Sequence, residues 1–188
     1  RNPDTNAPWG LNFGGHHMAL SLTSDGKKIT MSPYFIGTDP SEVKFGKYSG
    51  LRVLSKEEDY GFMFINSLTD AQKAVAILKQ DVPKDIITSP QAKQRIEGYY
   101  GIAAKELNET QMTIFKLLIQ EYTHNFEHDK AHQLMEKIMK SGIEKVYFAW
   151  IGSLDNNKPH YYIIHGPDFL IEYDNVGFQN DGNHIHAI

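Results

Sequence analysis

Strand-like patterns lie at both ends of this chain, and helical patterns fill its middle. Apolar and polar side chains alternate over residues 9–23, as in one half-buried strand, and residues 28–31 can return beside it after a hairpin turn. The later strand patterns share β-branched and aromatic residues between short polar links, and they cover residues 145–151, 160–165, 169–173 and 185–188. Antiparallel hairpins fit these short links best, so we expect an antiparallel sheet with strands from both ends of the chain.

Capping boxes predict where helices begin in the middle of the chain. Each box places a capping side chain three residues before its partner, as in Ser55 with Glu58, Thr69 with Gln72, and Asn108 with Gln111. We expect short helices over residues 56–67 and 70–79, a stronger helix from residue 108, and another that ends at Ser141-Gly142. Residues 32–50, which are rich in glycine and proline, predict a long ordered loop.

These patterns predict the α+β class. An antiparallel sheet built from the N- and C-terminal strands would carry a helical insertion, about residues 55–141, on one face. A chain of 188 residues fits one domain, so we assign residues 1–188 to a single domain. Because the chain opens at Arg1 without an initiator Met and stops at Ile188 within an apparent strand, we expect a fragment of a longer chain.

Composition and charge exclude several classes of protein. No apolar run is long enough to cross a bilayer, so we expect no membrane insertion. The net charge is −4 and the 19 basic residues are spread along the chain, which argues against a nucleic-acid partner. Cysteine is absent, which removes thiolate catalysis, zinc fingers and disulfides. Any metal ligand must therefore be His, Asp or Glu.

Two pairs of histidines, His16 with His17 and His184 with His186, lie at opposite ends of the chain. The period of two puts His184 and His186 on one side of a strand, while His16 and His17 point to opposite sides of another. If the terminal strands pair, three imidazoles can converge, and such clusters commonly hold a transition metal. We therefore predict a site for a divalent transition metal, zinc, copper or iron, with open coordination positions.

Polar residues near the C-terminal histidines complete the predicted site. Glu172, in the strand pattern before them, is the candidate for an extra ligand or a catalytic general base acting on a metal-bound water. Asp174, Asn175 and Asn183 are candidates to orient the histidine rings. Ordinary hydrogen-bonded histidines are the competing interpretation, because none of these spacings matches a zinc-finger or HExxH motif.

Other histidines and the aromatic residues have simpler interpretations. His124, His128 and His132 recur every four residues, but a polar, exposed helix start explains them better than a metal site. His160 and His165 lie on opposite faces of a strand, so at most one can join the cluster. The aromatic content of 12% suits either a ligand pocket or an ordinary core.

Several motifs, taken in order along the chain, resemble one uncharacterised family, known as domain of unknown function (DUF) 3500. They are Pro8-Trp9-Gly10, Gly15-His16-His17, Ser21-Leu22-Thr23, Gly50-Leu51-Arg52-Val53-Leu54, Glu57-Glu58-Asp59, Phe148-Ala149-Trp150, Pro159-His160-Tyr161-Tyr162, Gly166-Pro167, Phe169-Leu170-Ile171-Glu172-Tyr173-Asp174-Asn175 and Asn183-His184-Ile185-His186. The resemblance implies longer relatives, many of them exported bacterial or fungal proteins, so we expect a periplasmic or extracellular location, with a cytoplasmic one as the alternative. The resemblance implies no established activity. It implies that the family's motif histidines correspond to His16, His17, His184 and His186, and that its motif acid corresponds to Glu172.

Three hypotheses for the function remain. The first is a metal-dependent hydrolase or oxidase in which His17, His184 and His186 hold the ion and Glu172 moves a proton. The second is a non-catalytic, extracellular module that binds a small-molecule ligand. The third is an assembly module that associates with itself or another chain through unpaired strand edges.

Overall fold

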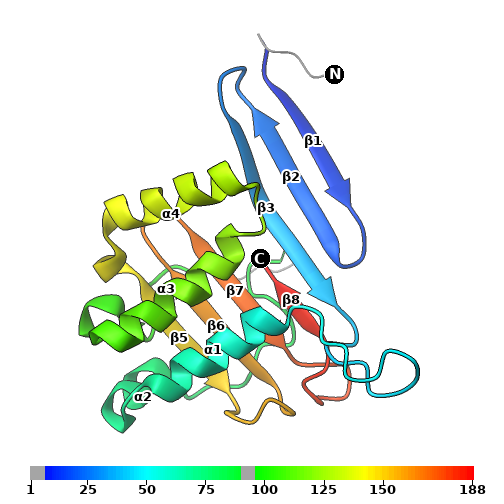
Figure 1. Cartoon of the computed structure of the whole chain (residues 1–188), viewed down its shortest axis with the longest axis vertical. Helices are drawn as coiled ribbons and strands as arrows, with labels where there is room; N and C mark the ends of the chain where they lie inside the picture. The colour runs from blue at the N-terminus through cyan, green and yellow to red at the C-terminus, as the bar shows by residue number, and fades with distance from the viewer. Residues whose placement is uncertain (1–6, 90–95) are drawn as a thin grey trace.

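The computed structural model describes residues 7–89 and 96–188. Arg1, named above as one end of the expected fragment, lies outside the described residues. Within this part of the chain, eight strands form one antiparallel sheet in the order β1-β2-β3-β8-β7-β6-β5-β4 (Figure 1). The strands are β1 (Trp9–Gly14), β2 (Met18–Ser24), β3 (Ile29–Thr38), β4 (Ile102–Ala103), β5 (Tyr147–Gly152), β6 (His160–His165), β7 (Leu170–Asn175) and β8 (Ile185–Ala187). The α+β class, built from terminal strands, is confirmed.

Among the described residues between β3 and β5, the chain forms four α-helices and two 3₁₀ turns. They are α1 (Ser55–Ser67), α2 (Asp70–Ala76), η1 (Ala104–Glu106), α3 (Glu109–Thr123), α4 (His128–Gly142) and η2 (Ile143–Lys145). The α-helices cover one face of the sheet over β5 to β8, as predicted, while β1 and β2 extend past them (Figure 1). Among residues 7–89 and 96–188, no helix is both long and apolar enough to span a membrane.

Two of the three predicted capping boxes are present. Thr69 with Gln72 opens α2, and Asn108 with Gln111 opens α3. The box at Ser55 is wrong, because α1 begins after Leu54 in the left-handed conformation, without a side-chain cap. Helix α2 ends three residues before the predicted Lys79, since the chain becomes extended there and the N–H of Leu78 donates to the carbonyl of Trp150.

The single strand predicted over residues 9–23 is wrong, because this stretch is the β1–β2 hairpin, which turns at Gly15–His17. The alternation continues through the turn, since opposite partners such as Leu11 and Leu22 lie on the same face of an antiparallel pair. The loop predicted over residues 32–50 is also wrong in its first part. Strand β3 continues to Thr38, and a shift in the β2–β3 register accommodates Pro33.

The core lies mainly between the sheet and the helices. Phe64 of α1, Phe115 of α3 and Phe148 of β5 pack there with no more than 1% of each exposed. A smaller apolar cluster lies on the opposite face, where Tyr161 and Ile163 are covered by the segment that follows α2. Apart from Tyr147, the aromatic side chains of β5, β6 and β7 are thus buried core residues, as the simpler interpretation predicted.

The terminal strands do not pair with each other, so the predicted arrangement is wrong on this point. β2 and β3 lie between β1 and β8, and β8 pairs with β3 on one side and β7 on the other. The two ends of the chain nevertheless meet in one sheet, because the β1–β2 turn lies at the end of the hairpin nearest β8 (Figure 1).

Candidate metal centre

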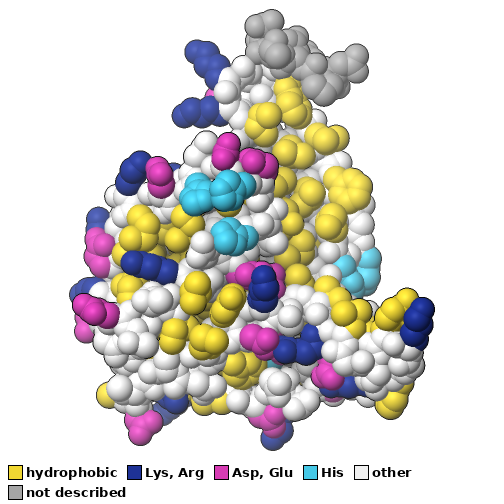
Figure 2. All heavy atoms as spheres, in the orientation of Figure 1, with side chains coloured by type: hydrophobic (Ala, Val, Ile, Leu, Met, Phe, Trp, Pro, Cys, Tyr) yellow, Lys and Arg dark blue, Asp and Glu magenta, His cyan; other side chains and the backbone are white. Residues whose placement is uncertain are grey.

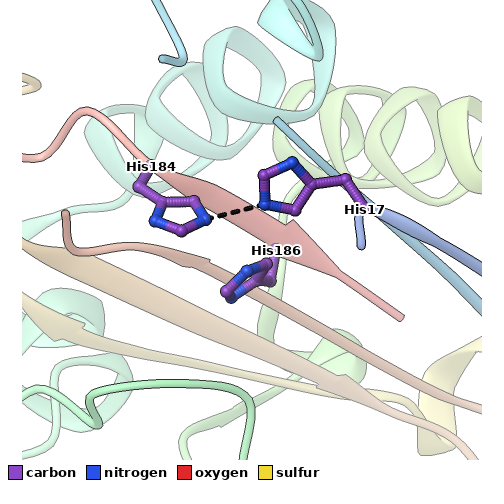
Figure 3. A group of neighbouring side chains, drawn as sticks. All are labelled: His17, His184 and His186. Carbon is purple, nitrogen blue, oxygen red and sulfur yellow. Dashed lines mark hydrogen bonds between the residues drawn. The ribbon is translucent and has the colours of Figure 1, made fainter. Parts of the chain in front are cut away.

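Three of the four predicted histidines converge. His17 belongs to the β1–β2 turn, His184 directly precedes β8, and His186 lies within it. The Nε2 atoms of His17 and His184 are 2.9 Å apart, and the rings of His184 and His186 lie 4.5 Å apart between centroids (Figure 3). One ligand nitrogen from each of the three rings lies within 4.8 Å of the others. Residues 167 positions apart in sequence therefore form one cluster.

Strand β3 lies between His17 and His186, and the glycine at position 37 of this strand lets the two rings come together across it. Gly37 lies in β3 opposite His186 in the β3–β8 pairing, and its N–H donates to the carbonyl of His17 at 2.9 Å. A Cβ atom here would lie 3.0 Å from Cδ2 of both rings and 2.8 Å from the carbonyl oxygen of Ile185. Because such contacts are too short, only glycine lets the two rings meet across the strand.

The cluster favours neutral imidazoles at His17 and His184. Burial lowers the pKa of His17, and the neighbouring rings of His16, His184 and His186 lower it further. Burial likewise lowers the pKa of His184, and the charge of His186 lowers it further. A neutral ring keeps a lone pair on one nitrogen, which is the form that binds a metal.

His186 has a different environment, because two carboxylates face its Nδ1 atom. Asp85 Oδ1 lies at 3.1 Å and Asp174 Oδ2 at 3.4 Å, and Asp174 is directly opposite His186 in the β7–β8 pairing. Burial alone lowers the pKa of His186, but the two carboxylates outweigh it and raise the value to about 9. Burial raises the pKa of Asp174 to about 6, against the opposing effect of His186. The carboxylates occupy the Nδ1 side and leave Nε2 for a metal.

The two predicted asparagines form hydrogen bonds with main-chain groups and with other side chains, not with the histidine rings. Asn175 is fully buried, and its Oδ1 accepts from the main-chain N–H of His184 at 2.9 Å while its Nδ2 donates to Glu58. Asn183 Oδ1 accepts from Ser41 Oγ at 2.8 Å and from the main-chain N–H of Glu42 at 2.9 Å. Both side chains therefore fix the segment that carries His184, and their effect on the ring is indirect.

Glu172 lies on β7, two residues before Asp174, and is not part of the three-histidine cluster. One carboxylate oxygen accepts from the N–H of Ile87 at 2.6 Å and from the hydroxyl of Tyr161. The other accepts from the N–H of Thr88 at 3.0 Å and from its hydroxyl. With four donors, the carboxylate of Glu172 anchors the segment that follows α2, and a role as general base stays a prediction.

The remaining histidines lie outside the cluster. His16 is exposed, with its ring 4.3 Å from that of His17 instead of on the opposite side, so that the predicted orientation is wrong. His160 is buried and stacks on Trp150, and His165 lies against Gly98, so neither joins the cluster. The other three lie exposed around the α3–α4 junction, as the simpler interpretation predicted: His124, His128 and His132.

Sequence reasoning missed Asp85 and Gly37. Asp85 lies in an irregular connector, so no periodic pattern relates it to the histidines. Gly37 falls in the stretch that the sequence predicts to be a loop, where a glycine has an ordinary explanation. A correct prediction of β3 would have indicated that a glycine inside a strand often marks the close approach of another group.

The observed nitrogen positions suit a metal ion. Zinc–nitrogen bonds are about 2.0–2.1 Å long, so two nitrogens bound to one ion lie about 2.9–3.4 Å apart for angles between 90° and 109°. The 2.9 Å between Nε2 of His17 and His184 falls within that range. The ligand atom of the third ring lies within 4.8 Å of the other two, so this ring must move closer to complete the site.

Comparison with known proteins identifies the chain at the level of family. A search of curated proteins and a search of solved structures found no match. The family described as "Protein of unknown function (DUF3500)" matches residues 1–188. Because this match covers the full sequence given, the resemblance of the motifs is confirmed, and the chain belongs to the DUF3500 family.

Proposed function

We propose that this protein binds a divalent transition-metal ion through His17, His184 and His186 and uses it for hydrolytic or oxidative chemistry. The observation that carries the proposal is the convergence of three imidazoles with two Nε2 atoms 2.9 Å apart. Two of these rings have a lowered pKa, which favours the form that binds metal. Three protein ligands leave coordination positions open, as in catalytic metal sites.

The residues around the rings have distinct roles in this proposal. His17, on an exposed turn, gives solvent and substrate access to the centre, while His184 is 6% exposed and fixes its inner side. Asp174 and Asp85 hold the Nδ1 side of His186, which orients that ring. When bound, the ion would supply Lewis acidity or redox chemistry. Glu172 remains the predicted base in this proposal, and its carboxylate is held by four hydrogen-bond donors.

A metal titration tests the proposal. The protein, stripped with chelator and dialysed, is titrated with Zn²⁺, Cu²⁺ and Fe²⁺ in a calorimeter, next to the variants His184→Ala and His132→Ala. Both variants remove one imidazole, but His132 is exposed on α4 and far from the cluster in sequence. We expect tight binding that His184→Ala weakens at least 100-fold and His132→Ala leaves unchanged. Equal affinities for both variants would refute the proposal.

One observation favours assembly as the second candidate function. The exposed apolar side chains of the β1–β2 hairpin lie on strands that the helices do not cover, and they include Leu11, Phe13 and Met18 (Figure 2). Each is more than 40% exposed, and β1 is an edge strand. Such a surface suits contact with another chain. Sedimentation at several protein concentrations tests it, since a strict monomer at the highest concentration would exclude self-association.

A further inference from the structure

A second group of possible ligands adjoins the three-histidine cluster. Asp85, Asp174 and His186 each offer an atom within 4.8 Å of the other two. The Nδ1 atom of His186 lies 3.1 Å from Asp85 Oδ1 and 3.4 Å from Asp174 Oδ2. Two ligands bound to one small cation at about 2.1 Å lie about 3.0–3.4 Å apart, so the spacing is that of a shared ion.

Two buried atoms of this group lack hydrogen-bond partners. Within the part of the chain that the structure describes, neither Asp174 Oδ2 nor His186 Nδ1 has one, although they face each other. Asp174 is 1% exposed. The carboxylate oxygens lie close to the ring nitrogen without the geometry of a hydrogen bond from it. A buried carboxylate is rarely left in this state, and a cation between these atoms would satisfy both.

The group is held in place by the rest of the fold. Asp174 and His186 are opposite partners on two hydrogen-bonded strands. Asp85 lies on the segment after α2, and its Oδ1 accepts from the N–H of Ile86 at 2.7 Å. Ile87 and Thr88 follow, and the buried carboxylate of Glu172 accepts hydrogen bonds from both of their main-chain N–H groups. The Glu172 anchor therefore fixes where Asp85 meets His186.

We propose that Asp85, Asp174 and Nδ1 of His186 form a second cation site, next to the three-histidine site. Two carboxylates and one imidazole suit a divalent ion of the manganese or zinc type, and the two negative charges balance it. His186 then serves both sites, with Nε2 toward the first ion and Nδ1 toward the second, and releases its ring protons to solvent. Because His186 is shared, the form with two ions rests on the proposed function, in which the first ion binds the three histidines. The second site can also hold an ion alone, and it then needs only the neutral form of His186.

Manganese binding to the stripped full chain, measured by electron paramagnetic resonance and by metal analysis after dialysis, tests this inference. Asp85→Asn removes a ligand from the second site only, and its side chain is 55% exposed, so the fold should persist. His17→Ala removes a ligand from the first site only. His132→Ala is the control, and circular dichroism verifies the fold of each variant.

We expect the parent protein and His132→Ala to bind two equivalents of metal, and Asp85→Asn and His17→Ala to bind one each. Manganese affinity should fall at least tenfold in Asp85→Asn and change less than threefold in His17→Ala. Unchanged manganese affinity in Asp85→Asn, or no metal retained by His17→Ala, would overturn the second site. If Asp85→Asn retains no metal while His17→Ala equals the parent protein, the three-histidine site fails and the second site stands.

Discussion

Replacing Gly37 with alanine should break the cluster without touching a ligand. The new Cβ would lie 2.8 Å from the carbonyl oxygen of Ile185 and 3.0 Å from Cδ2 of His17 and of His186. Ordinary contacts start at 3.4 Å, so the rings and the β3–β8 pair must move apart by about half an ångström. Overpacking of this kind typically costs about 1–3 kcal/mol of unfolding free energy. Displacement of two ligands should weaken zinc binding by about 10–100-fold, as disturbed ligand orientation does elsewhere.

The matched control for this variant is Gly14→Ala. Gly14 also lies in a strand of the same hairpin region, but a Cβ there would meet nothing within 4 Å. Urea denaturation gives the change in unfolding free energy, and calorimetric titration with Zn²⁺ gives the change in affinity. If both variants lose the same stability and bind zinc equally well, Gly37 is not what allows the rings to meet, and the steric argument is wrong.

Three further predictions test single interactions. In metal-free protein the pKa of His186 is raised to about 9. The charged ring therefore contributes about 1–3 kcal/mol to the free energy of unfolding below pH 6.5, and this contribution is lost as the pH rises toward 9. Urea midpoints measured across this range should fall for the parent protein and stay flatter for His186→Gln. Glu172→Gln turns an amide NH₂ toward donors and should cost about 2–4 kcal/mol, with faster proteolysis of the anchored segment; unchanged stability would contradict the anchoring role. Asn108→Ala removes a capping box and should lower the free energy of unfolding by about 1 kcal/mol. Thermal unfolding measures this loss, with Thr113→Ala, a change at an exposed position of the same helix, as the control.

Local signals predicted the helices well where the determinants lie within one turn. The boxes at Thr69 and Asn108 form because the partner is three residues away and needs nothing else from the fold. The same pattern failed at Ser55, since Glu58 is engaged there by Arg52 and Asn175 instead. Helix α1 begins at Ser55 all the same, so a capping pattern can predict a helix start even where a tertiary partner takes the side chain that would close the box.

Strand patterns predicted which residues face the core but not how the chain reverses. A period of two is the same on both arms of a hairpin, so the pattern predicts one continuous strand across the turn at Gly15–His17. The meeting of His17 with His184 and His186 was predicted from strand pairing, yet it depends on Gly37 in the strand between them. Asp85 could not be predicted, because its position depends on an anchor at Glu172 that only the folded chain provides.

Anomalous diffraction from crystals of protein purified without chelator tests the central claim most directly. We predict a peak at a transition-metal absorption edge about 2.0–2.2 Å from Nε2 of both His17 and His184, with His186 as the third ligand, and its loss in His184→Ala. A flat anomalous map, with those two nitrogens still 2.9 Å apart and joined only by a hydrogen bond, would contradict the account.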